Sequence, residues 1–178
     1  AISAFLCGLF LLWFFDRYFK RLWLGFVSSL LLITCPGFIA EHVSRTGDYD
    51  AMLVLFTTIY LVSIFQFIRT EKKKWMYIFF AALFLGFMTK SIAAFLFIPG
   101  VAVYILLTKN LIPILKNKHF YFGLLGLTTA ISLFLLLREN ADPGYVKAAF
   151  FNDVSGRFND ALDSHRGGFW YYYSYLVS

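Results

Sequence analysis

The sequence predicts an all-α protein: a polytopic transmembrane helical bundle of about six or seven membrane segments, with an outward-facing polar loop region. Three observations predict it. The 178 residues are 60% hydrophobic and only 15% charged, with a mean hydropathy of +0.71, whereas soluble domains carry about 25% charged residues. The apolar residues form runs that approach the roughly 20 residues a bilayer-spanning helix needs. The basic residues concentrate in alternate connections between these runs.

The first half of the chain supplies three of the predicted segments. Residues 1–15 are apolar but too few for a whole span, so the sequence is interpreted as part of a longer protein. Residues 22–40 form a second span, and the pair Pro36–Gly37 is expected to loosen or end its helix. The polar stretch 41–50 follows, and residues 51–68 form the third span.

The second half has shorter apolar runs. Residues 75–89 and 92–107 flank Lys90–Ser91, and each would be about 23 Å long as a helix. We interpret them as a tight helical hairpin; the alternative, one interrupted helix, would overshoot the bilayer. Residues 120–137 form the next span, and the aromatic residues 169–178 open a further one.

These segments divide the chain into three regions. Residues 1–137 are expected to be a transmembrane helical region, incomplete at its start, and residues 138–168 an extracytoplasmic loop. Residues 169–178 are expected to begin another transmembrane helix.

The distribution of charge predicts which side of the membrane each connection faces. If the loops alternate, one side holds ten of the 16 Lys and Arg residues and only two of the ten acidic residues, Asp16 and Glu71. Short cytoplasmic loops are enriched in Lys and Arg. The other side, with the 41–50 loop, Lys90 and residues 138–168, is therefore predicted to face the periplasm or exterior of a plasma (inner) membrane. The net charge of +6 reflects this topology, and no pattern indicates nucleic-acid binding.

Polar groups on the outward side are the candidates for chemistry. Asp50 stands at the start of a predicted helix, where a carboxylate either caps the helix or acts as a base or metal ligand. Asp48 likewise either has a loop or capping role or takes part in the chemistry of the site. Arg45 and Lys90 suit a lipid phosphate, although Arg45 could instead pair with a nearby Asp and Lys90 could extend from a hairpin tip toward water. His165 alone is a weak metal signal.

Three segments resemble a known family. S-R-T-G-D-Y-D-A-M-L-V-L-F (residues 44–56) is similar to the R-x-G-x-x-D-x-x-L-x-x-F pattern of polytopic C-type glycosyltransferases, in the branch of aminoarabinose transferases and protein O-mannosyltransferases. L-G-F-M-T-K-S (residues 85–91) resembles the L-G-x-x-T-K-G turn of that branch, with Ser91 where Gly is usual. H-R-G-G-F-W-Y-Y-Y (residues 165–173) resembles H-x-G-P-x-W-Y-Y, with Gly168 where Pro is common. The order and spacing of the three segments agree with the family.

The resemblance implies an inverting glycosyltransferase that moves a sugar from a polyprenyl-phosphate donor to a lipid, glycan or protein acceptor on the outer face. The site residues expected from it are Asp50 and Asp48 as catalytic residues, with the principal catalytic Asp expected upstream of this chain. A possible divalent metal would be bound by Asp50 and His165. The expected contacts with the donor phosphate are Arg45, Lys90 and Arg166.

Two other functions remain open from the sequence. A transporter or lipid flippase would place ionisable groups near mid-membrane, whereas here they lie at the ends of the apolar runs. A non-enzymatic membrane scaffold or sensor would not depend on the outward carboxylates.

Overall fold

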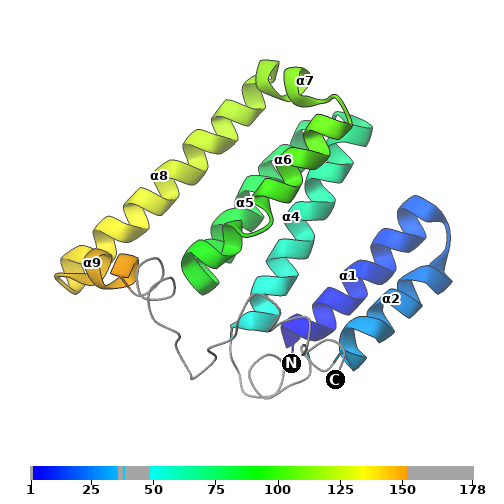
Figure 1. Ribbon diagram of the computed structural model, residues 1–178, viewed down its shortest axis with the longest axis horizontal. Helices are drawn as coiled ribbons and strands as arrows, with labels where there is room; N and C mark the ends of the chain where they lie inside the picture. Colours follow the sequence, from blue (N-terminus) through cyan, green and yellow to red (C-terminus); the bar gives the residue numbers. More distant parts are fainter. Residues whose placement is uncertain (1, 36–37, 39–48, 152–178) are drawn as a thin grey trace, which may run out of the picture. The chain divides into compact units, whose positions relative to one another are not determined.

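The computed structural model describes residues 2–35, 38 and 49–151. Across these residues the secondary structure is helical and contains no strand (Figure 1), so the predicted all-α class is confirmed. The chain divides into two compact units, residues 1–132 and residues 133–178, and each is described by itself.

The first unit holds most of the helices. They are α1 (Ile2–Phe19), α2 (Leu22–Thr34), α4 (Asp50–Thr70), α5 (Lys73–Lys90), the 3-10 helix η2 (Ser91–Phe95), α6 (Ile98–Leu107), α7 (Leu111–Lys116) and the larger part of α8 (Lys118–Ala141). The second unit contains the end of α8 and α9 (Tyr145–Phe150). Helix α8 continues past the predicted boundary at residue 137, and the proposed division into a helical region, a loop and a further helix stays a prediction.

Four helices in the described residues are long and apolar enough to cross a membrane. They are α1, with 18 residues, α4, with 21, α5 together with η2, with 23, and α8, with 24. Helices α2 and α6 are apolar but shorter. The predicted count of six or seven membrane segments is therefore supported only in part.

Helix α2 ends earlier than the sequence predicted. The expected span ran to residue 40, but the helix stops at Thr34 and the backbone of Cys35 is extended, with φ −64° and ψ 121°. Cys35 precedes Pro36, and the proline ring disfavours the helical conformation of the residue before it. The proline therefore ends the helix rather than only loosening it.

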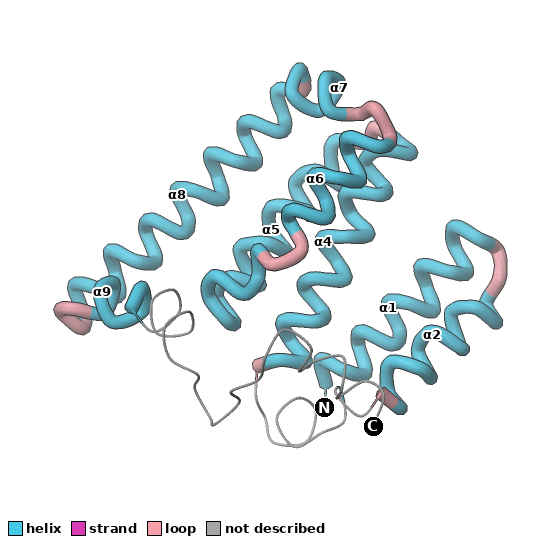
Figure 2. Tube along the Cα trace, in the orientation of Figure 1, coloured by secondary structure: helices cyan, strands magenta, loops and turns pink. Residues whose placement is uncertain are grey.

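The chain reverses direction between α5 and α6. Ser91 adopts a positive φ of 48°, and a Cβ built on Gly86 would lie only 3.1 Å from Cβ of Ala94. In one straight helix these residues would be about 12 Å apart along the axis. The Tyr60 hydroxyl also donates a hydrogen bond to the Ala94 carbonyl at 3.2 Å. The interpretation of residues 75–107 as two helices thus agrees with the structure (Figure 2).

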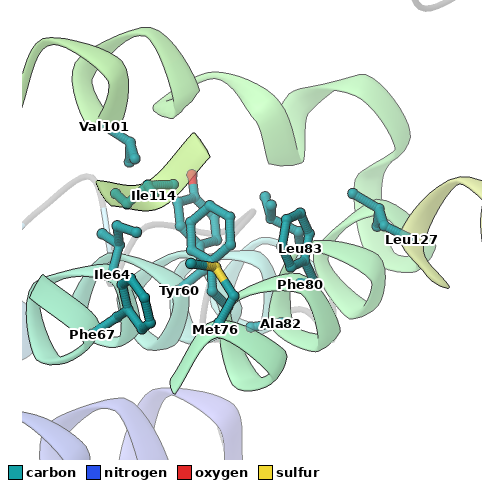
Figure 3. Packing of buried hydrophobic residues seen from close by; sticks show 11 residues of the cluster. Tyr60, Ile64, Phe67, Met76, Phe80, Ala82, Leu83, Val101, Ile114 and Leu127 are labelled. Carbon is teal, nitrogen blue, oxygen red and sulfur yellow. The ribbon is translucent and has the colours of Figure 1, made fainter. Parts of the chain in front are cut away.

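The core of the first unit lies where α4 and α5 pack against each other. Tyr60, Ile64 and Phe67 of α4 meet Met76 and Leu83 of α5 (Figure 3). Further helices add Val101, Ile114 and Leu127 to the same cluster. Because lipid is as apolar as these side chains, close van der Waals packing, and not removal from water, holds the α4–α5 pair together in a membrane. This packing fixes the relative position of the two helices that carry the candidate site.

Helix α1 packs beside α4 and runs parallel to it. The Cys7 thiol lies 3.7 Å from the Thr58 hydroxyl, and the rings of Phe14 and Phe65 are 5.6 Å apart. Helix α2 returns antiparallel to α1, as Figure 1 shows. The Ser29 hydroxyl donates to the Gly8 carbonyl at 2.9 Å across this pair.

Charge separates between the two ends of the first unit. The turns that follow α1, α4 and α6 lie at one end together with the start of α8 (Figure 1). Two contacts at this end support the arrangement. The ring centroids of Trp13 in α1 and Trp75 in α5 are 6.4 Å apart, and the Tyr77 hydroxyl of α5 forms a hydrogen bond with His119 of α8. This basic end carries ten basic residues: Arg17, Lys20, Arg21, Arg69, Lys72, Lys73, Lys74, Lys109, Lys116 and Lys118. Asp50 and Lys90 lie at the opposite end.

Candidate functional site

Asp50 and Lys90 occupy helix ends that suit their charges. Asp50 is the first residue of α4, where the unpaired N–H groups and the positive end of the helix dipole favour a carboxylate. Lys90 is the last residue of α5, where the negative end of the dipole favours a cation. Because α4 and α5 run antiparallel, the start of one meets the end of the other.

The two side chains form an ion pair across this helix junction. The Lys90 ammonium donates to Oδ1 of Asp50, and the side chains are only 32% and 25% exposed, respectively. A charge-assisted hydrogen bond in a partly dry place is stronger than one in water. An ammonium has three donors, so Lys90 can hold Asp50 and still present N–H groups to an anion.

The pair links two of the three motif segments. Asp50 belongs to the segment 44–56 and Lys90 to the segment 85–91, so the structure brings together two predicted site residues that are 40 positions apart. Sequence reasoning named both residues but did not pair them with each other. An acidic residue that opens one helix and a basic residue that ends the next are a signal for such a pair, although only the antiparallel packing of α4 against α5 brings them into contact.

Four other predicted site residues lie outside the described residues. Asp48, Arg45, His165 and Arg166 are in this group, and their assignments stay predictions.

The possible metal site gains no support from the described residues. Within residues 2–35, 38 and 49–151, no group of three His, Cys, Asp or Glu side chains could hold a metal. The Asp50 carboxylate is also engaged by an ammonium, which competes with a cation for the same oxygen. His165, the other predicted ligand, is outside these ranges.

Tyr60 is a structural contact that sequence reasoning missed. Its side chain is 1% exposed, and its hydroxyl bonds to the backbone just beyond Lys90. A tyrosine within an apolar span gives no sequence signal for such a role, since the partner is a backbone carbonyl. Tyr60 thus positions the segment that follows the candidate site.

Comparisons with known proteins identify the family of the chain. The family described as dolichyl-phosphate-mannose-protein mannosyltransferase matches residues 1–137. YkcB of Bacillus subtilis (strain 168), which carries the name of a proposed mannosyltransferase, is 31% identical over 84 residues, or 47% of this chain and 12% of YkcB. The chain therefore spans a small part of that relative's length. No solved structure matches the chain. The family match covers most of the sequence and confirms the resemblance to the polytopic C-type glycosyltransferases, so the chain belongs to the dolichyl-phosphate-mannose-protein mannosyltransferase family.

Proposed function

We propose that this chain is part of a multi-pass membrane glycosyltransferase that takes a sugar from a polyprenyl-phosphate-linked donor. The acceptor is a lipid, a glycan or a protein on the outer face of the membrane, and the anomeric configuration is inverted. The names of the matched family and of YkcB support mannose as the sugar. The structural observation that carries the proposal is the ion pair between Asp50 and Lys90.

The leaving group explains why a cation is needed at this place. When the bond between the anomeric carbon and the phosphate oxygen breaks, negative charge builds up on the lipid phosphate. A fixed ammonium in a partly dry site stabilises that charge better than water does. Lys90 is suited to this role, with Arg45 and Arg166 as further proposed contacts.

Asp50 has two roles in the proposal. It holds the Lys90 ammonium in place through a charge-assisted hydrogen bond. With Asp48 it belongs to the proposed acidic groups of the site, while the principal base that takes the proton from the acceptor hydroxyl is expected upstream. A divalent metal bound by Asp50 and His165 remains part of the proposal, and His165 lies outside the described residues.

The separation of charge supports an outward-facing site. The ten basic residues at the opposite end of the first unit match the enrichment of Lys and Arg in cytoplasmic loops. On this orientation, Asp50 and Lys90 face the periplasm or exterior, at the depth where lipid phosphates lie.

A transporter or flippase is not favoured. Transporters carry ionisable groups on discontinuous helices near mid-membrane, whereas Asp50 and Lys90 are the first and last residues of their helices. The family match also favours an enzyme.

The decisive experiment compares charge removal with charge exchange in the full-length protein. Membranes that contain Lys90→Gln or Asp50→Asn are assayed for transfer of labelled mannose from polyprenyl-phosphate mannose. Loss of a group that stabilises developing charge costs on the order of 100-fold in rate, so Lys90→Gln is expected to lose at least that much. Lys116→Gln, at the basic end, is the matched control and should retain full transfer.

The exchanged pair Asp50→Lys with Lys90→Asp separates chemistry from scaffolding. It keeps an ion pair but places the cation on the wrong helix and each charge at the unfavourable end of a helix dipole, so it should fold with a lower thermal midpoint and fail to transfer sugar. Normal sugar transfer by Lys90→Gln, or by the exchanged pair, would show that the contact between Asp50 and Lys90 has a structural role only. The thermal midpoint of each purified variant shows whether it has folded.

A further inference from the structure

A groove at the surface of the first unit lies apart from the candidate site. It runs between α5 and α8 and has a volume of about 220 Å³. Its walls are the apolar and aromatic side chains Phe80, Phe84, Phe122 and Leu127, with Gly123, Gly126 and Ala130 along its α8 side. Pockets that enclose a whole small molecule measure about 300–1,000 Å³. The groove is therefore suited to a segment of an apolar chain rather than to a complete ligand.

The groove is closed at one glycine of α8 and open at the next. At Gly123 the helices meet, since the Phe80 ring fills the space beside it. One turn further along α8, a Cβ built on Gly126 would have no heavy atom within 4 Å. The groove thus has a closed section at Phe80 and an open section beside Gly126.

A polar pair lies at the basic end of the groove. The Tyr77 hydroxyl and Nδ1 of His119 are 2.7 Å apart, and Tyr77 itself lines the groove. If the hydroxyl donates to Nδ1, the Nε2–H of His119 is available to a further acceptor. The pair is exposed, so it lies at a mouth rather than inside an enclosed cavity.

Two lysines continue the walls of the groove past this pair. Lys73 precedes Tyr77 by four residues on α5, and Lys118 precedes Phe122 by four residues on α8, so each lies on the same face of its helix as the wall residue. Both lysines are exposed. Among the residues that the structure describes, neither forms an ion pair. The mouth therefore carries two lysines that are not engaged in an ion pair with a described carboxylate.

We propose that this groove binds an anionic glycerophospholipid of the leaflet at the basic end of the protein. One acyl chain lies along Phe84, Gly126 and Ala130 and passes over the outside of the contact between Phe80 and Gly123, and the phosphate reaches Lys73, Lys118 and His119. An apolar groove with a cationic mouth at the membrane surface combines the two features that select such a lipid over a neutral one. This binding is separate from the proposed transferase site, which lies at the other end of the helices.

The test is a lipid titration of the purified full-length protein in mild detergent, followed by native mass spectrometry. Phosphatidylglycerol is compared with phosphatidylcholine. A lysine near an anionic headgroup contributes about fivefold in affinity, so the double variant Lys73→Gln with Lys118→Gln should lose about 25-fold for phosphatidylglycerol. Arg17→Gln with Arg21→Gln removes two charges from the same end on the α1–α2 pair and should lose little.

A second variant tests the groove itself. Gly126→Leu fills the open section, and Gly100→Leu is its matched control, because a Cβ at Gly100 also has no heavy atom within 4 Å. Gly126→Leu should abolish the binding of phosphatidylglycerol in the groove, and Gly100→Leu should preserve it. Equal binding of both lipids by the unmodified protein, or equal effects of the two leucine variants, would overturn the proposal. So would loss of a dimer mass in Gly126→Leu with unchanged lipid binding, since that result assigns the groove to a second copy of the chain.

Discussion

The ring of Phe80 on α5 occupies the space that a side chain at Gly123 of α8 would need. A Cβ at residue 123 would overlap the ring atoms Cδ2 and Cε2 of Phe80, which is itself 6% exposed and packed against Phe79 and Phe120. The ring therefore has little freedom to move away. Glycine at this position allows α8 to lie against α5.

Gly123→Ala should lower the stability of the first unit. Forcing extra volume into a packed contact costs about 1–3 kcal/mol, and the thermal midpoint in detergent measures the loss. Gly126→Ala is the control, since its Cβ meets no neighbour and alanine favours helix formation by up to about 1 kcal/mol. A midpoint for Gly123→Ala equal to or above that of Gly126→Ala would contradict the close contact.

Gly25→Ala should separate α1 from α2. A Cβ at Gly25 would lie 2.9 Å from Cα of Leu12, and backbone cannot move aside as a side chain can. We expect a loss of about 1–3 kcal/mol in stability. Gly8→Ala tests the same helix pair from the other side, where the added Cβ would lie 3.8 Å from Cβ of Ser29, an ordinary contact. Equal thermal midpoints for the two variants would argue against the close approach of α2 to the backbone of Leu12.

Ser91→Gly should stabilise the reversal between α5 and α6. Ser91 has φ 48° and ψ −128°, a backbone conformation that glycine adopts readily and residues with a Cβ rarely do. Relief of this strain should raise stability by roughly 1 kcal/mol. Ser91→Ala keeps the Cβ and should give no gain. Loss of stability in Ser91→Gly would show that the serine side chain has a role of its own at the turn.

Gln66→Met should raise the stability of the first unit. The Gln66 side chain is fully buried in α4, and neither its Oε1 nor its Nε2 has a hydrogen-bond partner among the described residues. An unpaired buried amide costs about 1–3 kcal/mol, which methionine of similar shape would avoid. Ser63→Ala is the control, because the Ser63 hydroxyl already donates to the Ile59 carbonyl at 2.7 Å. A drop in the midpoint of Gln66→Met would reveal a partner for the amide in the full-length protein.

The long helices could be predicted because their length and apolar composition decide them. The predicted spans 51–68 and 120–137 lie within α4 (Asp50–Thr70) and α8 (Lys118–Ala141), which begin one or two residues earlier and end two to four residues later. The end of α2 could not be predicted from hydropathy. The apolar sequence continues past Thr34, but the helical conformation ends there because Pro36 disfavours it in the preceding residue.

The candidate site could be predicted only residue by residue. Asp50 and Lys90 stand out because charge is rare in apolar sequence, but their pairing depends on how α4 packs against α5, which brings the start of one helix to the end of the other. The reversal that follows Lys90 depends on the contact between Gly86 and Ala94 and on the conformation of Ser91. No periodicity in the sequence encodes either feature, and the unpaired amide of Gln66 is likewise visible only in three dimensions.

The turn after α5 is attached to α4 at two separate places, through Lys90 to Asp50 and through the Ala94 carbonyl to Tyr60. Asp50 and Tyr60 are about 15 Å apart along the α4 axis. A segment held at two such distant anchors can neither slide along its neighbour nor swivel about a single bond. The ammonium of Lys90 is therefore kept in one register relative to α4. Tyr60→Phe removes one of the two contacts and should shift the Lys90 ammonium at the place where the sugar donor is proposed to bind.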